Sequence, residues 1–231
     1  MTTVLITGAN RGLGFEFARQ YLGDGWRVIA ASRNPVTSSE LRRLAQESGG
    51  KLNIVAMDVT DAESVRNTAT QLKDVTIDVL INSAGIAGAP GQKTGSVDYD
   101  SWAHVFDVNT MGPLRVLESF SDHIARGERR LVVTITSGMG SLADKNSGGS
   151  IAYRSSKAAV NMAVRSAAVD LAPRGIICVL VNPGWVRTDM GGPNAPLSPQ
   201  ESVTAMRRLI ETFGPNQSGK FYNYNGREYP W

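Results

Sequence analysis

The stretch TVLITGANRGLG, residues 3–14, joins a short apolar segment directly to a glycine-rich turn. TVLIT is nearly continuously apolar, which is typical of a strand buried on both faces of a sheet. A helical segment follows the turn, so we expect the N–H groups at its N-terminus to be open to an anion. Gly8, Gly12 and Gly14 would let the backbone approach phosphates closely. Glycines needed only for tight packing are the alternative, but the position after the first strand favours a diphosphate site.

The alternation of apolar runs and helical segments continues along the chain and predicts an α/β fold. It favours a doubly wound parallel sheet with helices on both faces. We expect long helices over 98–125, with a kink or break at Pro113, and over 151–172. No repeat or linker interrupts the pattern, so residues 1–231 are interpreted as a single domain. The further expected strands are 27–32, 52–57, 77–82, 130–136 and 176–182.

Composition indicates a folded protein and disfavours several classes of function. The chain is 42% hydrophobic and 19% charged, with a net charge of +3. Its basic residues are scattered, which gives little support to nucleic-acid binding. No apolar run approaches the roughly 20 residues of a membrane span, and the N-terminus lacks a secretory pattern, so we expect a cytoplasmic protein. The single cysteine, Cys178, is interpreted as a buried structural thiol.

The residues near the second strand indicate which dinucleotide would bind. Enzymes that use NAD usually carry an acidic residue about 20 residues after the first glycine. Asp24 precedes the second strand and Glu40 comes well after it. Arg33 ends that strand and Arg11 lies in the glycine turn. Two guanidiniums near the ribose favour a 2′-phosphate, so we expect NADP(H) in preference to NAD(H). The alternative is that one or both arginines are solvated.

The stretch IAYRSSKAAV, residues 151–160, places Tyr153 and Lys157 four positions apart. This is about one helical turn, so the phenol and the ammonium would share one face of a helix. Taken alone, the spacing is far more typical of an ordinary helix surface. No second ligand stands at metal spacing near His104 or His123, and no metal is expected.

Several separated motifs together resemble the short-chain dehydrogenase/reductase family. The ending GKFYNYNGREYPW is similar to the C-factor and sniffer-type carbonyl reductase branch. The resemblance implies a Rossmann-like sheet of about seven strands, with FYNYN as the last. It also implies hydride transfer between a nicotinamide and a carbonyl or alcohol carbon. The motifs, in chain order, are TGANRGLG, INSAG (81–85), Asn109, Ser137, YRSSK (153–157) and NPGWVRTDM (182–190).

The resemblance implies catalytic roles for four residues. Tyr153 would be the general acid in reduction and the base in oxidation. A free phenol has a pKa near ~10, so Lys157 would stabilise the phenolate, and it would also bind the nicotinamide ribose. Ser137 would hydrogen-bond the substrate oxygen. Asn109 would hold a water in a proton relay reaching Lys157; the alternative is a polar residue satisfied inside its helix.

Two points about these roles stay open. Ser137 is alternatively a strand-end cap, and Thr136 or Ser141 are alternatives for its catalytic role. Asp58, after the third strand, would contact adenine or would only cap a helix. The resemblance implies a larger cofactor set across the chain, in which Pro183 to Thr188 would hold the nicotinamide carboxamide. That set is Gly8, Asn10, Arg11, Gly12, Leu13, Gly14, Arg33, Asp58, Val59, Asn82, Ala84, Gly85, Tyr153, Lys157, Pro183, Gly184, Val186 and Thr188.

Two segments are interpreted as loops at the substrate mouth. The gap between Ser137 and Tyr153 is a little longer than the family norm and rich in Gly, Ser and Asn, and 191–202 is rich in Pro and Gly. Apolar residues in or near these segments indicate either an apolar pocket or ordinary packing on the core. They are Met139, Leu142, Trp185 and Met190.

The functional hypothesis is an NADP(H)-dependent carbonyl reductase-like oxidoreductase acting on a small molecule. One rival is a non-catalytic dinucleotide-binding signalling or regulatory protein of C-factor type. Another is an NAD-dependent dehydrogenase of a lipid-like alcohol. A homodimer or homotetramer is expected, formed through helices 98–125 and 151–172. The sequence names neither the substrate nor the direction of the reaction.

Overall fold

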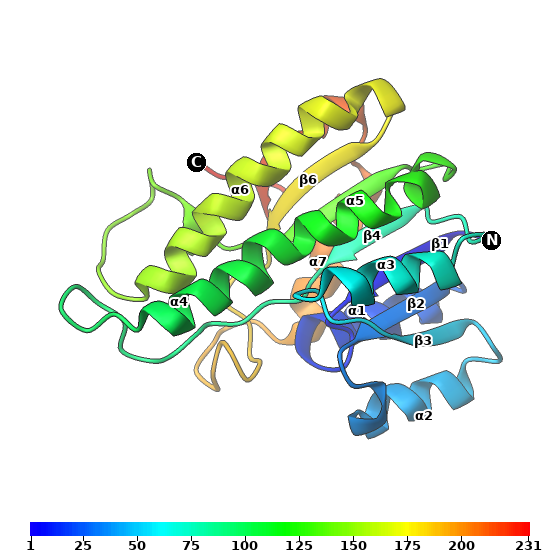
Figure 1. The fold of residues 1–231 in the computed structure, drawn as a ribbon, viewed down its shortest axis with the longest axis horizontal. Coiled ribbons are helices and arrows are strands. Elements are labelled where there is room, and N and C mark those ends of the chain that lie inside the picture. The colour runs from blue at the N-terminus through cyan, green and yellow to red at the C-terminus, as the bar shows by residue number, and fades with distance from the viewer.

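One parallel sheet of seven strands forms the centre of the molecule in the computed structural model, which describes residues 1–231 except the side chain of Thr37. The strand order is β3-β2-β1-β4-β5-β6-β7, and every neighbouring pair is parallel. The doubly wound α/β prediction is therefore confirmed (Figure 1). The strands are β1 Thr3–Thr7, β2 Arg27–Ser32, β3 Leu52–Ala56, β4 Val79–Asn82, β5 Leu131–Ile135, β6 Ile177–Asn182 and β7 Phe221–Asn223.

Helices cover both faces of the sheet and create two apolar cores. Successive strand residues alternate between them: Leu5 packs into the core under α3, α5 and α6, whereas Val4 and Ile6 pack under α1, α2 and α7. In Figure 1, α5 and α6 run alongside each other across one face of the sheet. The helices are α1 Gly12–Gly23, α2 Ser39–Glu47, α3 Ala62–Gln71, α4 Tyr99–Phe106, α5 Gly112–Ala125, α6 Ile151–Leu171 and α7 Pro199–Glu211.

The long helix expected over 98–125 is divided into α4 and α5 by a π-helical turn, Asp107–Met111. The N–H of Gly112 bonds to the carbonyl of Asp107, five residues earlier instead of four. Pro113 has no N–H to offer the carbonyl of Asn109, which explains why α-helical bonding cannot continue through this point. The break predicted from Pro113 is thus real, and it takes the form of a local π turn.

Both expected loops at the substrate mouth contain regular structure. Gly138–Gly140 form a short 3-10 turn directly after β5. The segment 191–202 ends inside a helix, because α7 begins at Pro199. Ser198 and Glu201 form a reciprocal capping box there, which sequence reasoning overlooked.

The sheet places its functional edge at the carboxyl ends of the strands. The chain order reverses between β1 and β4, which lie side by side at the centre of the sheet. At such a switch point, the loops after neighbouring strands diverge and leave a crevice. The segments after β1, β2, β3, β4, β5 and β6 all contribute residues to one cleft at this edge.

Candidate active site

The glycine turn after β1 packs against the segment after β4. Gly8 has a φ of +65°, and a Cβ atom there would lie 2.9 Å from the Cα of Ala84. A Cβ atom on Gly14 would overlap the carbonyl oxygen of Gly8. Arg11 is the N-cap residue of α1, and its side chain caps none of the helix N–H groups. Tight packing and an open helix N-terminus therefore coexist here, and the diphosphate site stays a prediction.

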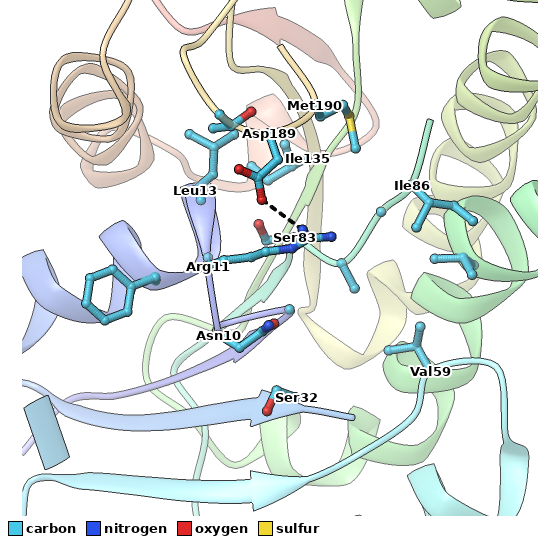
Figure 2. A pocket seen from close by; sticks show the side chains of 18 of the residues that line it. Asn10, Arg11, Leu13, Ser32, Val59, Ser83, Ile86, Ile135, Asp189 and Met190 are labelled. Carbon is cyan, nitrogen blue, oxygen red and sulfur yellow. Dashed lines mark hydrogen bonds and ion pairs between the residues drawn. The ribbon is translucent and has the colours of Figure 1, made fainter. Parts of the chain in front are cut away.

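A cleft of about 850 Å³ runs along the carboxyl edge of the sheet. Figure 2 shows it bordered by the glycine turn, the segment after β4 and the loop that follows β6. Most of the expected cofactor residues line this cleft. They are Gly8, Asn10, Arg11, Gly12, Leu13, Gly14, Arg33, Asp58, Val59, Ala84, Gly85, Tyr153, Lys157, Pro183 and Thr188.

Three expected cofactor residues do not line the cleft. Asn82 ends β4, is 3% exposed, and its amide lies 3.4 Å from the carbonyl of Pro113. Gly184 is packed tightly, since a Cβ atom there would lie 2.7 Å from Leu197 and 2.9 Å from Tyr224. Val186 is buried and forms a parallel bridge with Leu197. Each of them is adjacent in sequence to a residue that does line the cleft: Ser83, Pro183 and Arg187 respectively.

The end of the cleft beyond β2 and β3 carries charges of both signs. Arg33 is exposed after β2, and Asp58 follows β3. Burial alone would raise the pKa of Asp58, but hydrogen bonds from Thr60 and the charge of Arg33 hold that pKa below its usual value. The Asp58 carboxylate accepts from the N–H and the hydroxyl of Thr60 at 2.9 and 2.7 Å. Asp61, not Asp58, caps α3.

Sequence reasoning missed two carboxylates in the cleft wall. Glu40 lines the cleft from α2, although its distance along the chain argued against a role there. Glu16 lines it from the first turns of α1 and is held by Arg19 and Gln20, each with a contact of 2.6 Å. The short distance along the chain between Glu16 and the glycine turn could have placed Glu16 near the cleft. Placing Glu40 at the cleft would have required knowing how α2 packs.

Arg11 has a partner on the opposite side of the cleft. Its guanidinium donates to the carboxylate of Asp189 at 2.8 Å, as Figure 2 shows. The side chains are 66% and 79% exposed, so the ion pair contributes little to stability. The expected role of Arg11 at a ribose phosphate stays a prediction; in the structure its side chain links the glycine turn to the loop after β6.

Tyr153 and Lys157 lie one turn apart on α6, with Ser137 beside the phenol. A hydrogen bond joins the side chains of Tyr153 and Ser137. Ser137 Oγ also accepts the N–H of Met139 at 3.1 Å, so the serine caps the 3-10 turn as well. Thr136 bonds instead to Asn161 at 2.6 Å, and Ser141 to the carbonyl of Trp231 at 2.9 Å. Of the three candidates, Ser137 alone has its hydrogen bond to the phenol.

Burial governs the protonation of both groups on α6. It raises the pKa of Tyr153, and the hydrogen bond with Ser137 opposes that rise. Burial also lowers the pKa of Lys157 to about 8. The Lys157 ammonium donates to the carbonyl of Ile135 at 3.0 Å and lies 5.8 Å from the centroid of the Tyr153 ring. Burial therefore keeps the phenol protonated at neutral pH.

Asn109 lies in the π turn and clamps the chain after β4. Its Oδ1 accepts the N–H of Ile86 at 2.9 Å, and its Nδ2 donates to the Ile86 carbonyl at 2.9 Å and to Ser156 Oγ at 3.0 Å. This side chain is satisfied within the protein, as the alternative from the sequence allowed. A Cβ atom on Gly85 would lie 3.3 Å from Asn109 Oδ1 and 3.7 Å from Lys157 Nζ, so Gly85 passes between them.

Most of the apolar residues expected at the substrate mouth lie outside the cleft lining. Leu142, Trp185 and Met190 are 81%, 57% and 48% exposed, and of these only Met190 lines the cleft; Met139, the fourth expected residue, does not line it either. Within the described part of the chain, no cluster of three or more His, Cys, Asp or Glu side chains could hold a metal. None of the described helices has both the length and the apolar character that crossing a membrane requires.

Comparisons with known proteins agree with this geometry. The family model of short chain dehydrogenases matches residues 2–196. C-signal of Myxococcus xanthus is 48% identical over 167 residues, which cover 72% of this chain and all of that protein. The carbonyl reductase Sniffer of D. melanogaster superposes with a TM-score of 0.93 at 31% identity, with both chains fully covered. The NADPH-bound carbonyl reductase from chicken fatty liver gives a TM-score of 0.92 at 32% identity over 100% of this chain and 99% of that one. The chain therefore belongs to the short-chain dehydrogenase family of oxidoreductases.

Proposed function

We propose that this protein is an NADP(H)-dependent carbonyl reductase in which Tyr153 is the general acid. The observation that carries the proposal is the half-buried Tyr153 side chain, hydrogen-bonded to Ser137 and lining the same cleft as the glycine turn. A protonated phenol is the form that a general acid needs, and burial keeps Tyr153 in that form at neutral pH. The resting site therefore carries the proton that carbonyl reduction requires.

The residues of the cleft fit a dinucleotide phosphate. The uncapped N-terminus of α1 offers N–H groups to the diphosphate, and Gly8 and Gly14 leave no room for side chains there. Arg33 and Arg11 are the cations that would favour a 2′-phosphate, and the chicken relative is described as NADPH-bound. Asp58, Val59, Ala84, Gly85 and Thr188 would border the rest of the cofactor. When bound, the nicotinamide supplies the hydride.

The protein's own part of the chemistry is positioning and proton transfer. Ser137 would hydrogen-bond the carbonyl oxygen of the substrate and stabilise the charge that develops on it. Tyr153 would donate its proton to the same oxygen. Lys157 would bind the ribose hydroxyls and help to return a proton to the phenol. Asn109 would act indirectly, because its amide fixes the backbone of Ile86 beside the cleft.

The proposal is tested with a panel of ketones and aldehydes, following NADPH oxidation by absorbance. Tyr153→Phe should lower kcat by about 10²–10⁴-fold, because it removes the acid and keeps the ring. The Kd for NADPH should change little. Tyr99→Phe is the matched control, since Tyr99 is 72% exposed on α4. Near-normal turnover in Tyr153→Phe would remove the phenol from the mechanism.

The same experiment separates the rival functions. A non-catalytic dinucleotide-binding regulator, the hypothesis suggested by the C-factor resemblance, would bind NADPH without turning over any member of the panel. An NAD-dependent alcohol dehydrogenase would show a preference for NADH and for oxidation. A complete set of Asn109, Ser137, Tyr153 and Lys157 supports the catalytic reading.

We also propose self-association through α5 and α6. Met162 and Val169 are 65% and 73% exposed on α6, and Met111, directly before α5, is 45% exposed. Burying such side chains against a second copy would remove apolar surface from water. Light scattering at micromolar concentration should give the mass of a dimer or a tetramer. A monomer would contradict this part of the proposal.

A further inference from the structure

The C-terminal residues form a segment that the proposed chemistry does not use. After β7 the chain reverses and residues 227–231, called here the tail segment, return beside that strand. Asn223 donates its N–H to the carbonyl of Arg227 at 2.8 Å, and Tyr229 donates to the carbonyl of Phe221 at 2.7 Å. The tail segment therefore extends the sheet by an antiparallel pairing at its β7 edge.

Aromatic contacts anchor the tail segment to the core. The rings of Tyr229 and Trp231 pack on Phe221, with centroids at 4.9 and 5.8 Å. Phe221 is fully buried, so its position is fixed by the core. The guanidinium of Arg165, on α6, lies 4.8 Å from the centroid of the Trp231 ring. In Figure 1 the C-terminal end lies beside α6.

From this anchor, the tail segment holds the chain that follows Ser137. The Tyr229 phenol donates to the Asp144 carboxylate at 2.7 Å. The carbonyl oxygen of Trp231 accepts the N–H of Ala143 at 2.7 Å and the hydroxyl of Ser141 at 2.9 Å. Three hydrogen bonds thus connect residues 141–144 to an edge of the sheet that is remote in sequence.

The turn Gly138–Gly140 is wedged between the tail segment and α6. A Cβ atom on Gly138 would lie 2.5 Å from the Tyr229 phenol oxygen. A Cβ atom on Gly140 would lie 2.7 Å from the carbonyl carbon of Lys157. Both glycines allow the turn to approach its neighbours closely. Ser137 begins this turn and accepts the N–H of Met139, so any movement of the turn moves the Ser137 hydroxyl relative to Tyr153.

We propose that Tyr229 and Trp231 are positioning residues that hold the Ser137 hydroxyl against the Tyr153 phenol. The inference rests on the proposed function, because it concerns the geometry of that reaction. The tail segment fixes one side of the turn and α6 fixes the other. Loosening the tail segment leaves the cleft and the glycine turn intact and weakens the Ser137–Tyr153 hydrogen bond.

Two single substitutions test this role in the full-length protein. Tyr229→Phe removes the bond to Asp144 and keeps the ring on Phe221. Ser141→Ala removes the bond to the Trp231 carbonyl and also the bond that Ser141 Oγ accepts from the Asp144 N–H. Each should lower kcat for carbonyl reduction by about two- to tenfold, the effect of losing one or two hydrogen bonds, with the Kd for NADPH unchanged. Glu228→Gln is the matched control, because Glu228 lies in the same segment and its side chain pairs with Lys220 at 3.8 Å, away from the turn.

Two further measurements distinguish positioning from a purely structural role. The hydrogen bond with Ser137 lowers the pKa of Tyr153, so weakening that bond raises it. The rising limb of the pH profile for alcohol oxidation should move upward by about 0.5–1 pH unit in Tyr229→Phe and stay in place in Glu228→Gln. Hydrogen exchange of the amides in 138–144 should become faster in the same variant, and this readout needs no activity.

Faster exchange together with the lower kcat and the shifted profile supports the proposal. Faster exchange with the kcat and pH profile of the control overturns it, since the tail segment would then hold the turn without positioning Ser137. Unchanged exchange overturns it as well. A wild-type protein without carbonyl reduction overturns the proposed function and the positioning role with it, and that outcome is seen before any variant is made.

Discussion

The Lys157 ammonium is buried, and the structure predicts by how much its charge lowers the free energy of unfolding. The side chain is 5% exposed, and burial lowers its pKa from 10.5 to about 8. At about 1.36 kcal/mol per pKa unit, the difference corresponds to about 3 kcal/mol of destabilisation when the amine is charged. An apolar residue at this position would lack the hydrogen bond from Lys157 to the Ile135 carbonyl. That bond offsets about 1 kcal/mol of the destabilisation when wild type is compared with such a variant.

Lys157→Met should therefore stabilise the protein at pH 7 while it impairs catalysis. We expect the free energy of unfolding to rise by about 1–2 kcal/mol, equivalent to about 3–6 °C in Tm for a chain of this size. The pH dependence of this difference follows from proton binding by Lys157 in the folded and unfolded chains. Between pH 8 and 10.5 the unfolded chain binds more protons than the folded one, so wild-type stability rises with pH there. The advantage of the variant should shrink across this window and vanish near its upper end.

Urea denaturation at pH 7 and at pH 9.5 measures both parts of this prediction. Lys51→Met is the matched control, because Lys51 is exposed before β3 and its loss should change stability little at either pH. The reasoning would be refuted by a Lys157→Met protein that is less stable than wild type by the same amount at both pH values. That result would mean that the Lys157 side chain stabilises the fold by packing and that burying its charge does not lower the free energy of unfolding.

Three further variants test the cleft. Arg33→Ala should reduce the preference for NADPH over NADH by about three- to tenfold at low salt, measured by titrating both cofactors; an unchanged ratio would place Arg33 in solvent. Asp189→Asn releases Arg11 from its 2.8 Å ion pair and should tighten NADPH about two- to fivefold, an effect that 1 M salt removes; weaker binding would show that the pair itself supports the cofactor. Gly14→Ala should lower the free energy of unfolding by about 1–3 kcal/mol, because its Cβ overlaps the Gly8 carbonyl; unaltered urea denaturation would contradict this packing.

Features set by local sequence were predictable. Six strands fall within one or two residues of the expected runs, and Tyr153 and Lys157 share one face of α6 because a helix repeats every 3.6 residues. The glycine turn was also recognisable, since its neighbours in sequence are its neighbours in space. In each of these cases a periodicity or a turn determines the geometry without help from the rest of the chain.

Contacts between distant segments were not predictable in the same way. Arg11 and Asp189 are 178 positions apart, and nothing in either local sequence indicates that they pair. Asn109 matched its family motif, yet the partners of its amide follow from how the π turn packs on Ile86. Glu40 was set aside because of its position along the chain, and the packing of α2 brings it to the cleft.

The surroundings of Ser137 show why an extended loop need not disturb the proposed chemistry. The segment between Ser137 and Tyr153 is longer than the family norm, but both of its ends are fixed. Gly140 abuts the backbone of Lys157, and the N–H of Ile151, at the start of α6, donates to the carbonyl of Gln92 at 3.4 Å. Lengthening a loop whose ends are already held adds little closure entropy, because that cost grows only with the logarithm of length. Variation in this loop should therefore change which substrates reach the cleft while Ser137 and Tyr153 keep their hydrogen bond.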